Sequence, residues 1–211
     1  MPLMLETQQA SNQPPVGRVL RSRAFEGCNV HGSIAPSCYG NYKNALAAGY
    51  KYIDLYFFPC TGSTYNCKSP QTQINELVDF VNQNNMLVQT IWIDFEKDTT
   101  TCTKSWDGTA SSNLALAKQF TDAAKATKWN WGIYSSQGEW ETLFGSAGAV
   151  VDSRFKVWYA HPQNPLQPNY DDWKDMAFGG FSAPSGKQYG GGSGQCGSFD
   201  LNIFTYSTGA Q

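Results

Sequence analysis

Apolar and polar residues alternate with two different periods along the first two-thirds of the chain. Short apolar runs rich in β-branched and aromatic residues predict strands. Between them, apolar residues recur every three or four positions, which predicts amphipathic helices. The predicted strands are 18–25, 50–58, 86–96, 131–135 and 155–160, and the predicted helices are 39–48, 69–82, 116–127 and 138–144. Regular alternation of strand and helix favours a mainly parallel sheet, and the length favours a closed barrel.

The last third of the chain has a different character. From Pro162 onward Pro, Gly, Asn and Gln dominate, and only residues 170–175 suit a helical turn. Three short apolar segments, 176–181, 187–189 and 199–204, predict strands joined by glycine-rich turns. The stretch 190–194 is interpreted as such a turn, and it is a poor phosphate cradle because no helix follows it. We therefore expect an alternating α/β part followed by a mostly β part.

The strand predicted over 86–96 ends in two acids, Asp94 and Glu96. Side chains alternate along a strand, so Trp92, Asp94 and Glu96 share one face. Glycoside hydrolysis needs a protonated and an ionised carboxyl group close together, commonly at the carboxyl end of a barrel strand. The pair is therefore a candidate catalytic pair. The alternative is a strand that simply runs out into solvent.

Two further acids alternate with apolar residues in predicted strands. Asp54 shares a face with Tyr52 and Tyr56, and it is either a buried structural acid with a partner or a member of the site. Asp200 lies opposite Phe199 and is either at the same barrel end or on the polar outer face of an edge strand. If the strands face the same way, Asp54, Asp94, Glu96 and Asp200 converge at one barrel mouth.

Composition limits the classes of function. With 211 residues, 41% of them hydrophobic and 15% charged, the chain fits one globular domain. A net charge of −2 argues against nucleic acid or an anionic membrane as a partner, and no apolar run is long enough to span a bilayer. Two His and no Cys-x-x-Cys pair make a metal site improbable, so we expect no cofactor. Seven Trp and eleven Tyr could serve as stacking faces for sugars or as core residues.

The six cysteines indicate an oxidising compartment. The spacings Cys28…Cys38 and Cys60…Cys67 suit local disulfides, although six cysteines allow fifteen connectivities and six reduced buried thiols are the alternative. Residues 1–17 are polar, contain Pro14-Pro15 and lack the apolar segment of a signal peptide. The cysteines thus predict a secreted protein, whereas residues 1–17 do not have the pattern of a secretion signal. We interpret 1–17 as a disordered or non-native tail.

Six separated motifs occur in a recognisable order and spacing. They are Ile-Asp-Leu-Tyr-Phe-Phe-Pro-Cys60, Trp-Ile-Asp-Phe-Glu96, Trp-Gly-Ile-Tyr-Ser135, Val-Trp-Tyr-Ala-His161, Lys-Gln-Tyr189 and Phe-Asp-Leu-Asn202. Together they resemble the lysozymes of glycoside hydrolase family 25, in the cysteine-containing form of invertebrates and protists. The resemblance covers residues 18–204. It implies an irregular TIM-like α/β barrel of five strand–helix units followed by three strands.

The resemblance also implies a function. Family members hydrolyse the β-1,4 bond between N-acetylmuramic acid and N-acetylglucosamine, so the expected partner is the glycan strand of peptidoglycan. The expected protein is a monomer in an extracellular, lysosomal or phagosomal location. Carried over by motif, Glu96 is the general acid, Asp94 its partner and Asp200 the C-terminal active-site Asp. Tyr56, Tyr134 and Trp158 match aromatic positions that line the groove, and we place Asp54 with them as substrate-binding.

The main departure from the family is at the N-terminus. Family members begin with a strand carrying Asp-Val-Ser or a similar triplet, whose Asp belongs to the active site, whereas 1–17 hold only Glu6. Residues 18–25 match the second strand of the family, so the first strand–helix unit is missing from the match. We expect one catalytic barrel over 18–211, with an alternative or mispredicted start as the hypothesis for 1–17.

Two other functions stay open. A catalytically impaired glycan-binding barrel is favoured by the missing first Asp. A chitinase-like glycosidase is the second alternative, although the chitinase signature Asp-x-x-Asp-x-Asp-x-Glu requires acids where Gln89 and Trp92 stand.

Overall fold

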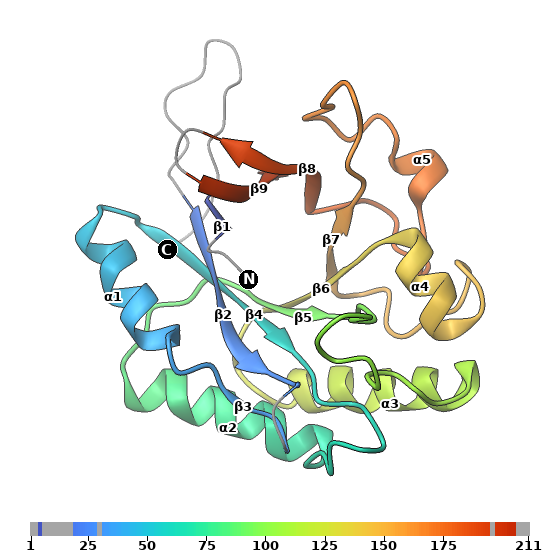
Figure 1. The fold of residues 1–211 in the computed structure, drawn as a ribbon, viewed down its shortest axis with the longest axis horizontal. Helices are drawn as coiled ribbons and strands as arrows, with labels where there is room; N and C mark the ends of the chain where they lie inside the picture. Colours follow the sequence, from blue (N-terminus) through green and yellow to red (C-terminus); the bar gives the residue numbers. More distant parts are fainter. Residues whose placement is uncertain (1–3, 6–18, 29–30, 195–196, 206–211) are drawn as a thin grey trace.

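The computed structural model describes residues 4–5, 19–28, 31–194 and 197–205, and one curled sheet forms its centre (Figure 1). The strand order is β1-β2-β4-β5-β6-β7-β8-β9, with β3 paired to β2. From β2 to β8 neighbouring strands are parallel, whereas β1, β3 and β9 pair antiparallel. The strands are β1 (Met4–Leu5), β2 (Val19–Glu26), β3 (Ser33–Ile34), β4 (Tyr52–Phe58), β5 (Ile91–Asp94), β6 (Trp131–Ser135), β7 (Lys156–Ala160), β8 (Gly186–Gly194) and β9 (Gly197–Phe204).

The helices lie around the outside of the sheet (Figure 1). They are α1 (Cys38–Ala47), α2 (Pro70–Gln83), α3 (Ala110–Lys125), α4 (Gln137–Phe144) and α5 (Trp173–Met176). Side-chain caps begin three of them, because the hydroxyls of Ser69, Thr109 and Ser136 accept hydrogen bonds from backbone N–H groups of the first turn. None of the helices in the described part of the chain combines the length and the apolar character needed to cross a membrane.

The two faces of the sheet are filled differently. The outer face carries aliphatic and aromatic residues such as Ile93 and Ile133, which pack with the helices into the main hydrophobic core. The inner face carries a separate aromatic cluster. Its members are Tyr56, Trp92, Tyr134, Trp158 and Phe204. The strict alternation of side chains in β4 to β7 therefore sends one set of residues to the helices and the other into the barrel.

The inner cluster is tightly packed. The ring centroids of Trp158 lie 4.4 Å from Tyr134, 5.8 Å from Trp92 and 5.4 Å from Phe204. Gly132 makes this possible, because a Cβ atom at that position would lie 2.3 Å from the Trp92 ring. The aromatic cluster therefore packs inside the curled sheet, and Tyr56, Tyr134 and Trp158 of the cluster also line a pocket.

The TIM-like α/β fold is confirmed, with corrections to three elements. Strand β5 covers only Ile91–Asp94, so Glu96 lies beyond its end. Residues 176–181 are not a strand, because Gly179 and Gly180 take φ values of 63° and 72°. Residues 190–194 are not a turn but the second half of β8, where they pair with β9. Glycines have no side chains to give a strand pattern, so the sequence predicted a turn. The hydrogen bonds between strands need only backbone groups, which these glycines provide.

Within the described residues, the hydrogen-bonded path of strands runs from β1 to β9 without pairing back on itself, so the sheet is a curled half-barrel and not the expected closed barrel. Met4–Leu5 pairs antiparallel with β2 and also contacts β9, so the two edges of the sheet come close together. The other residues of the predicted tail 1–17 lie outside the described residues. The seam of the barrel therefore runs beside β9, the strand that carries Asp200.

Candidate active site

A pocket of about 230 Å³ opens above the inner aromatic cluster, at the carboxyl ends of the parallel strands. It collects six of the seven side chains that the sequence predicted for the site, and it adds Gln188. Its lining residues are Tyr56, Asp94, Glu96, Tyr134, Trp158, Gln188 and Asp200. Acids at the mouth and aromatic rings at the walls are the composition expected of a sugar-binding pocket.

Asp94 is the last residue of β5 and is only 7% exposed. Its Oδ1 atom has no hydrogen-bond partner among the described residues. Burial, and after it the charge of the neighbouring Glu96, raises the pKa of Asp94 well above its usual value. A buried carboxyl oxygen without a partner disfavours the folded state, so its presence indicates a functional role.

Glu96 lies two residues beyond β5 and borders the pocket from the loop. Burial raises the pKa of Glu96 to about 7, the charges of Glu139, Asp98 and Asp200 add to the effect, and Arg23 opposes it. Asp94 and Glu96 interact, so the pair resists losing both protons. Their mutual repulsion therefore favours a singly protonated pair over a doubly ionised one.

Asp200 enters the pocket from β9, on the opposite wall. It stands across the hairpin from Gly191, where a Cβ atom would lie 3.0 Å from Asp200 Oδ1. Burial raises the pKa of Asp200. Of the two interpretations that the sequence left open, the structure has Asp200 at the barrel mouth.

Hydrogen bonds fix the aromatic walls of the pocket. The Tyr134 hydroxyl donates to Gln188 Oε1 at 2.8 Å, and Trp158 Nε1 donates to Asn202 Oδ1 at 3.0 Å. Arg23 Nε donates to the Tyr56 hydroxyl at 3.0 Å. Each of these wall residues therefore has its polar atom held by a partner on another strand, which keeps the ring faces in place.

Sequence reasoning missed Gln188 as a site residue. The alternation of side chains along a strand could have identified it, because Lys187 and Gln188 are neighbours on β8 and must face opposite sides of the sheet. Lys187 is fully buried on the outer face, where its Nζ donates to Asp172 at 2.9 Å, so Gln188 points into the barrel. Because Tyr134 occupies Gln188 Oε1, the amide N–H donors of Gln188 remain for a ligand in the pocket.

Asp54 does not join the acids at the mouth, which corrects the expected convergence of four carboxylates. It is fully buried four residues before the end of β4 and does not line the pocket. Its oxygens accept hydrogen bonds from Thr90 N at 3.1 Å and from Trp92 Nε1 at 3.0 Å. Asp54 is on the predicted face but one layer too deep, where it holds the Trp92 ring beneath the pocket.

A second pocket of about 270 Å³ shares Glu96 with the first. Its lining is more charged and includes Arg23, Lys97, Asp98 and Glu139. Glu139 lies in the first turn of α4 and was also missed from the sequence, where Ser136-Gln-Gly-Glu139 reads only as a helix-capping pattern. Glu96 therefore stands between an aromatic pocket and a charged one.

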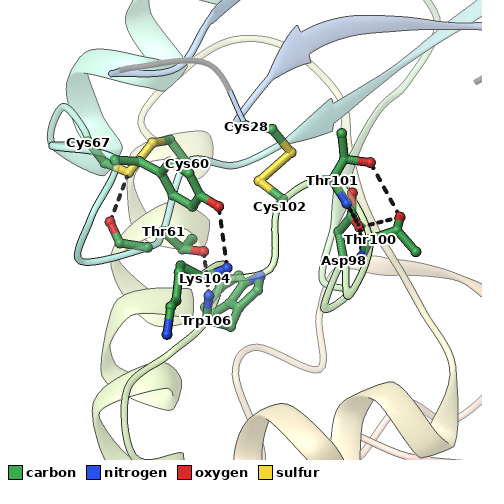
Figure 2. The surroundings of a disulfide bond; sticks show 12 residues. Cys28, Cys60, Thr61, Cys67, Asp98, Thr100, Thr101, Cys102, Lys104 and Trp106 are labelled. Carbon is green, nitrogen blue, oxygen red and sulfur yellow. Dashed lines mark hydrogen bonds between the residues drawn. A yellow bond between two sulfur atoms is a disulfide. The ribbon is translucent and has the colours of Figure 1, made fainter.

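A disulfide forms part of the wall of the charged pocket. Cys28 and Cys102 join the end of β2 to the loop that follows Glu96 (Figure 2). In the same loop Asp98 Oδ1 accepts hydrogen bonds from Thr100 N at 2.7 Å and Thr101 N at 2.8 Å (Figure 2). The loop on this side of Glu96 is thus fixed by one covalent link and by local turns.

The predicted disulfide pairing was correct in one of two bonds. Cys60 and Cys67 are joined as expected. The predicted Cys28–Cys38 bond is wrong, because Cys28 pairs with Cys102 and Cys38 is a free, buried thiol at the start of α1. Burial raises the pKa of the Cys38 thiol to about 12, so it is unreactive. Cys196 lies outside the described residues.

No metal centre accompanies these acids in the part of the chain that the structure covers. Within residues 4–5, 19–28, 31–194 and 197–205, no three His, Cys, Asp or Glu side chains are grouped to hold a metal ion.

Comparisons with known proteins agree on one family. A family model described as Lysozyme-like protein 1 matches residues 16–189. Probable GH family 25 lysozyme 4 of Dictyostelium discoideum is 32% identical over 82% of this chain and 74% of its own length. Counting factor 45-1 of the same organism is 34% identical over 79% of this chain and 52% of its own length.

Among solved structures, the modular autolysin LytC from Streptococcus pneumoniae, in complex with a synthetic peptidoglycan ligand, has the same fold. The TM-score is 0.61 at 14% sequence identity, and the match covers 89% of this chain and 40% of the autolysin.

Proposed function

Because the chain belongs to the glycoside hydrolase family 25 lysozymes and lysozyme-like proteins, we propose that it hydrolyses the β-1,4 bond between N-acetylmuramic acid and N-acetylglucosamine in peptidoglycan. One observation carries the proposal. Glu96, with a pKa raised to about 7, stands beside the buried Asp94 at the mouth of an aromatic pocket. Neutral carboxyl groups at neutral pH are rare in proteins and serve well as general acids.

The pocket supports a two-carboxyl mechanism. Protonated Glu96 donates its proton to the glycosidic oxygen. The bond between this oxygen and the anomeric carbon of N-acetylmuramic acid then breaks, and the N-acetylglucosamine unit leaves. The positive charge that develops at the anomeric carbon is stabilised by the carboxylates of Asp94 and Asp200, or by the acetamido oxygen of the substrate itself. Water then attacks the anomeric carbon and gives a proton back to Glu96, which completes the hydrolysis and restores the acid. Burial strengthens every charge interaction in these steps, because the aromatic walls exclude water.

Substrate binding follows from the walls of the same pocket. The rings of Tyr56, Tyr134 and Trp158 offer flat apolar faces to a sugar ring. The amide of Gln188, held by Tyr134, donates hydrogen bonds to sugar oxygens. We assign the neighbouring charged pocket to the part of the glycan that lies beyond the scissile bond, since both pockets meet at Glu96.

The disulfides and the family support a place of action outside the reducing cytosol. Cys28–Cys102 and Cys60–Cys67 persist in an oxidising environment. We propose an extracellular or lysosomal location, where bacterial cell walls are met, and a monomer acting on the glycan strand.

Clearing of bacterial cell-wall suspensions tests the reaction. The parent chain is expected to lower the turbidity, and Glu96→Gln is expected to lose this activity by a factor of about 10³. New reducing ends should be N-acetylmuramic acid. Reducing ends of N-acetylglucosamine, or equal cleavage of chitin oligosaccharides, would contradict the muramidase proposal and favour the chitinase-like alternative.

Glycan binding without cleavage is the second candidate. It is favoured by one observation, namely that among the described residues neither β1 nor β2 contributes an acid to the lining of the pocket. Co-sedimentation with purified cell walls separates the two functions. Binding by the parent chain without any clearing, at every pH between 4 and 8, would support the binding function and reject hydrolysis.

A further inference from the structure

We propose that Glu139 is a positioning residue for Glu96: it anchors the backbone immediately after the acid and places a negative charge opposite it. The inference rests on the proposed hydrolysis and deepens it. Glu139 belongs to α4, a helix that none of the site motifs includes, and it reaches the site through the charged pocket that it shares with Glu96.

Glu139 uses its carboxylate away from its own helix. The Ser136 hydroxyl accepts a hydrogen bond from Glu139 N at 3.1 Å, which is one half of a capping box. In the usual capping box the glutamate carboxylate accepts a hydrogen bond from the backbone N–H of the N-cap residue, here Ser136. Here Glu139 Oε2 instead accepts a hydrogen bond at 2.9 Å from the backbone N–H of Lys97, which lies 42 residues earlier in the chain.

This bond completes a pair of anchors on either side of Glu96. The sheet ends at Asp94, and Phe95 N still donates to Tyr134 O at 2.9 Å. The next anchored group is Lys97 N, bonded to Glu139. Glu96 is therefore held between two backbone bonds, and both acceptors belong to the same β6–α4 unit. Without the second anchor, the peptide that follows Glu96 would lose its partner and the acid its fixed direction.

The charge of Glu139 acts on the same group. The charged side chains that face Glu96 are Asp94 from β5, Asp98 and Lys97 from the following loop, Asp200 from β9, Arg23 from β2 and Glu139 from α4. Burial is the first cause that raises the pKa of Glu96, and the charge of Glu139 comes next. An anion that helps Glu96 keep its proton extends the pH range in which Glu96 can act as an acid.

Two substitutions separate the two effects. Glu139→Gln keeps an acceptor for Lys97 N but removes the charge. Its wall-clearing activity should match the parent within about twofold at pH 5, and the ratio of activity at pH 7.5 to that at pH 5 should fall about threefold or more. Glu139→Ala removes the anchor as well. It should lower kcat about tenfold at pH 5 and further at pH 7.5, with little change in KM.

Glu141→Gln is the matched control. Glu141 lies on the same helix, is exposed and does not line the charged pocket. Glu141→Gln therefore changes the net charge as Glu139→Gln does, but at a position outside the pocket that holds Glu96. We expect an unchanged pH profile and an unchanged kcat. A shift equal to that of Glu139→Gln would show that net charge alone is responsible, and would overturn the proposal.

A titration of the Glu96 carboxyl carbon by NMR, assigned with Glu96→Gln, gives a readout independent of cleavage. Glu139→Gln should lower the midpoint for Glu96, whereas Glu141→Gln should not. An equal midpoint in parent and Glu139→Gln rejects the role of Glu139, even if the chain cleaves peptidoglycan. A lowered midpoint in a chain that cleaves nothing keeps the role and rejects only the hydrolysis. Because Glu139→Gln keeps the acceptor, the test does not depend on Glu139→Ala folding.

Discussion

Asp54 and Asp94 are two buried acids on the inner side of neighbouring strands, at different depths of the barrel. Asp54, in the deep layer, accepts hydrogen bonds from Thr90 and from the indole of Trp92. Asp94, in the mouth layer, has an oxygen without a partner among the described residues and a raised pKa. Both are nearly inaccessible to solvent, at 0% and 7% exposure. Burial is therefore common to the two layers, and only the supply of partners distinguishes them.

The difference shows what each layer does. In the deep layer polar groups are matched with one another, and the result is a rigid support for the Trp92 ring. Under the proposed function, the acids of the mouth layer find their partners in the substrate, because a group already satisfied within the protein has little to offer a transition state. Substitutions in the two layers should therefore differ in whether they change activity or stability.

The largest effect is expected from Asp94→Asn. Under the proposed mechanism, loss of the carboxylate should lower kcat of wall hydrolysis by a factor of about 10² or more, since the developing positive charge loses an anion that stabilises it. The free energy of unfolding should stay the same or rise, because a buried carboxyl without a partner is replaced by a neutral amide. Denaturant unfolding beside initial-rate assays measures both. A clear loss of stability would show that Asp94 is as structural as Asp54.

Asp54→Asn should give the opposite result. An amide can accept from only one of the two N–H groups that Asp54 serves, so one buried donor is left facing another donor. The expected cost is about 1–3 kcal/mol of unfolding free energy. Activity measured well below the melting temperature should fall less than for Asp94→Asn. Asp79→Asn, at an exposed position of α2, is the control and should leave stability unchanged. Full stability of Asp54→Asn would contradict the assignment of a supporting role.

Gln188→Ala should have a smaller effect, on the wall of the mouth. Removing the amide that Tyr134 holds should lower kcat/KM about tenfold, the order expected for one lost hydrogen bond to a buried sugar oxygen. Tyr134→Phe keeps the ring and the amide but releases Gln188 Oε1, so its kcat/KM should lie between those of the parent and Gln188→Ala. Equal activity in all three proteins would remove Gln188 from substrate binding.

The smallest effect concerns pH and stability. The pKa of Glu96 is about 7 in the folded chain and 4.5 in its ordinary state, so the folded state binds the proton more tightly. Stability from this group is thus fully present below about pH 4.5 and is lost as pH rises through 7. Glu96→Gln removes this dependence. The melting temperature of Glu96→Gln relative to the parent should rise between pH 4.5 and pH 8, and a constant difference would contradict the raised pKa.

Much of the fold could be predicted because period-two and helical patterns report which side chains face the core. Trp131–Ser135 and Lys156–Ala160 form strands almost as expected, and Asp94 and Tyr134 face inward. Depth could not be read in this way. Asp54 has the predicted face, but its height in the barrel depends on the register between strands, in which β4 begins before β5.

Contacts across the mouth were equally hidden. Cys28 pairs with Cys102, 74 residues away, because both loops reach the same rim, and sequence spacing favoured the nearer Cys38. Glu139 was absent from the sequence predictions, and its contact with Lys97 depends on the loop after β5 lying against α4. In both cases the information lies in the arrangement of loops around the barrel, which no single segment contains.

Glu96 is the one acid of the mouth that stands outside every strand and helix, and no side-chain hydrogen bond holds it among the described residues. A change of this side chain therefore removes no side-chain hydrogen bond from the framework. Under the proposed function, one substitution at this position would leave the hydrogen bonds of the framework intact and remove the acid. This single position would then separate a chain that cuts glycan from one that only binds it.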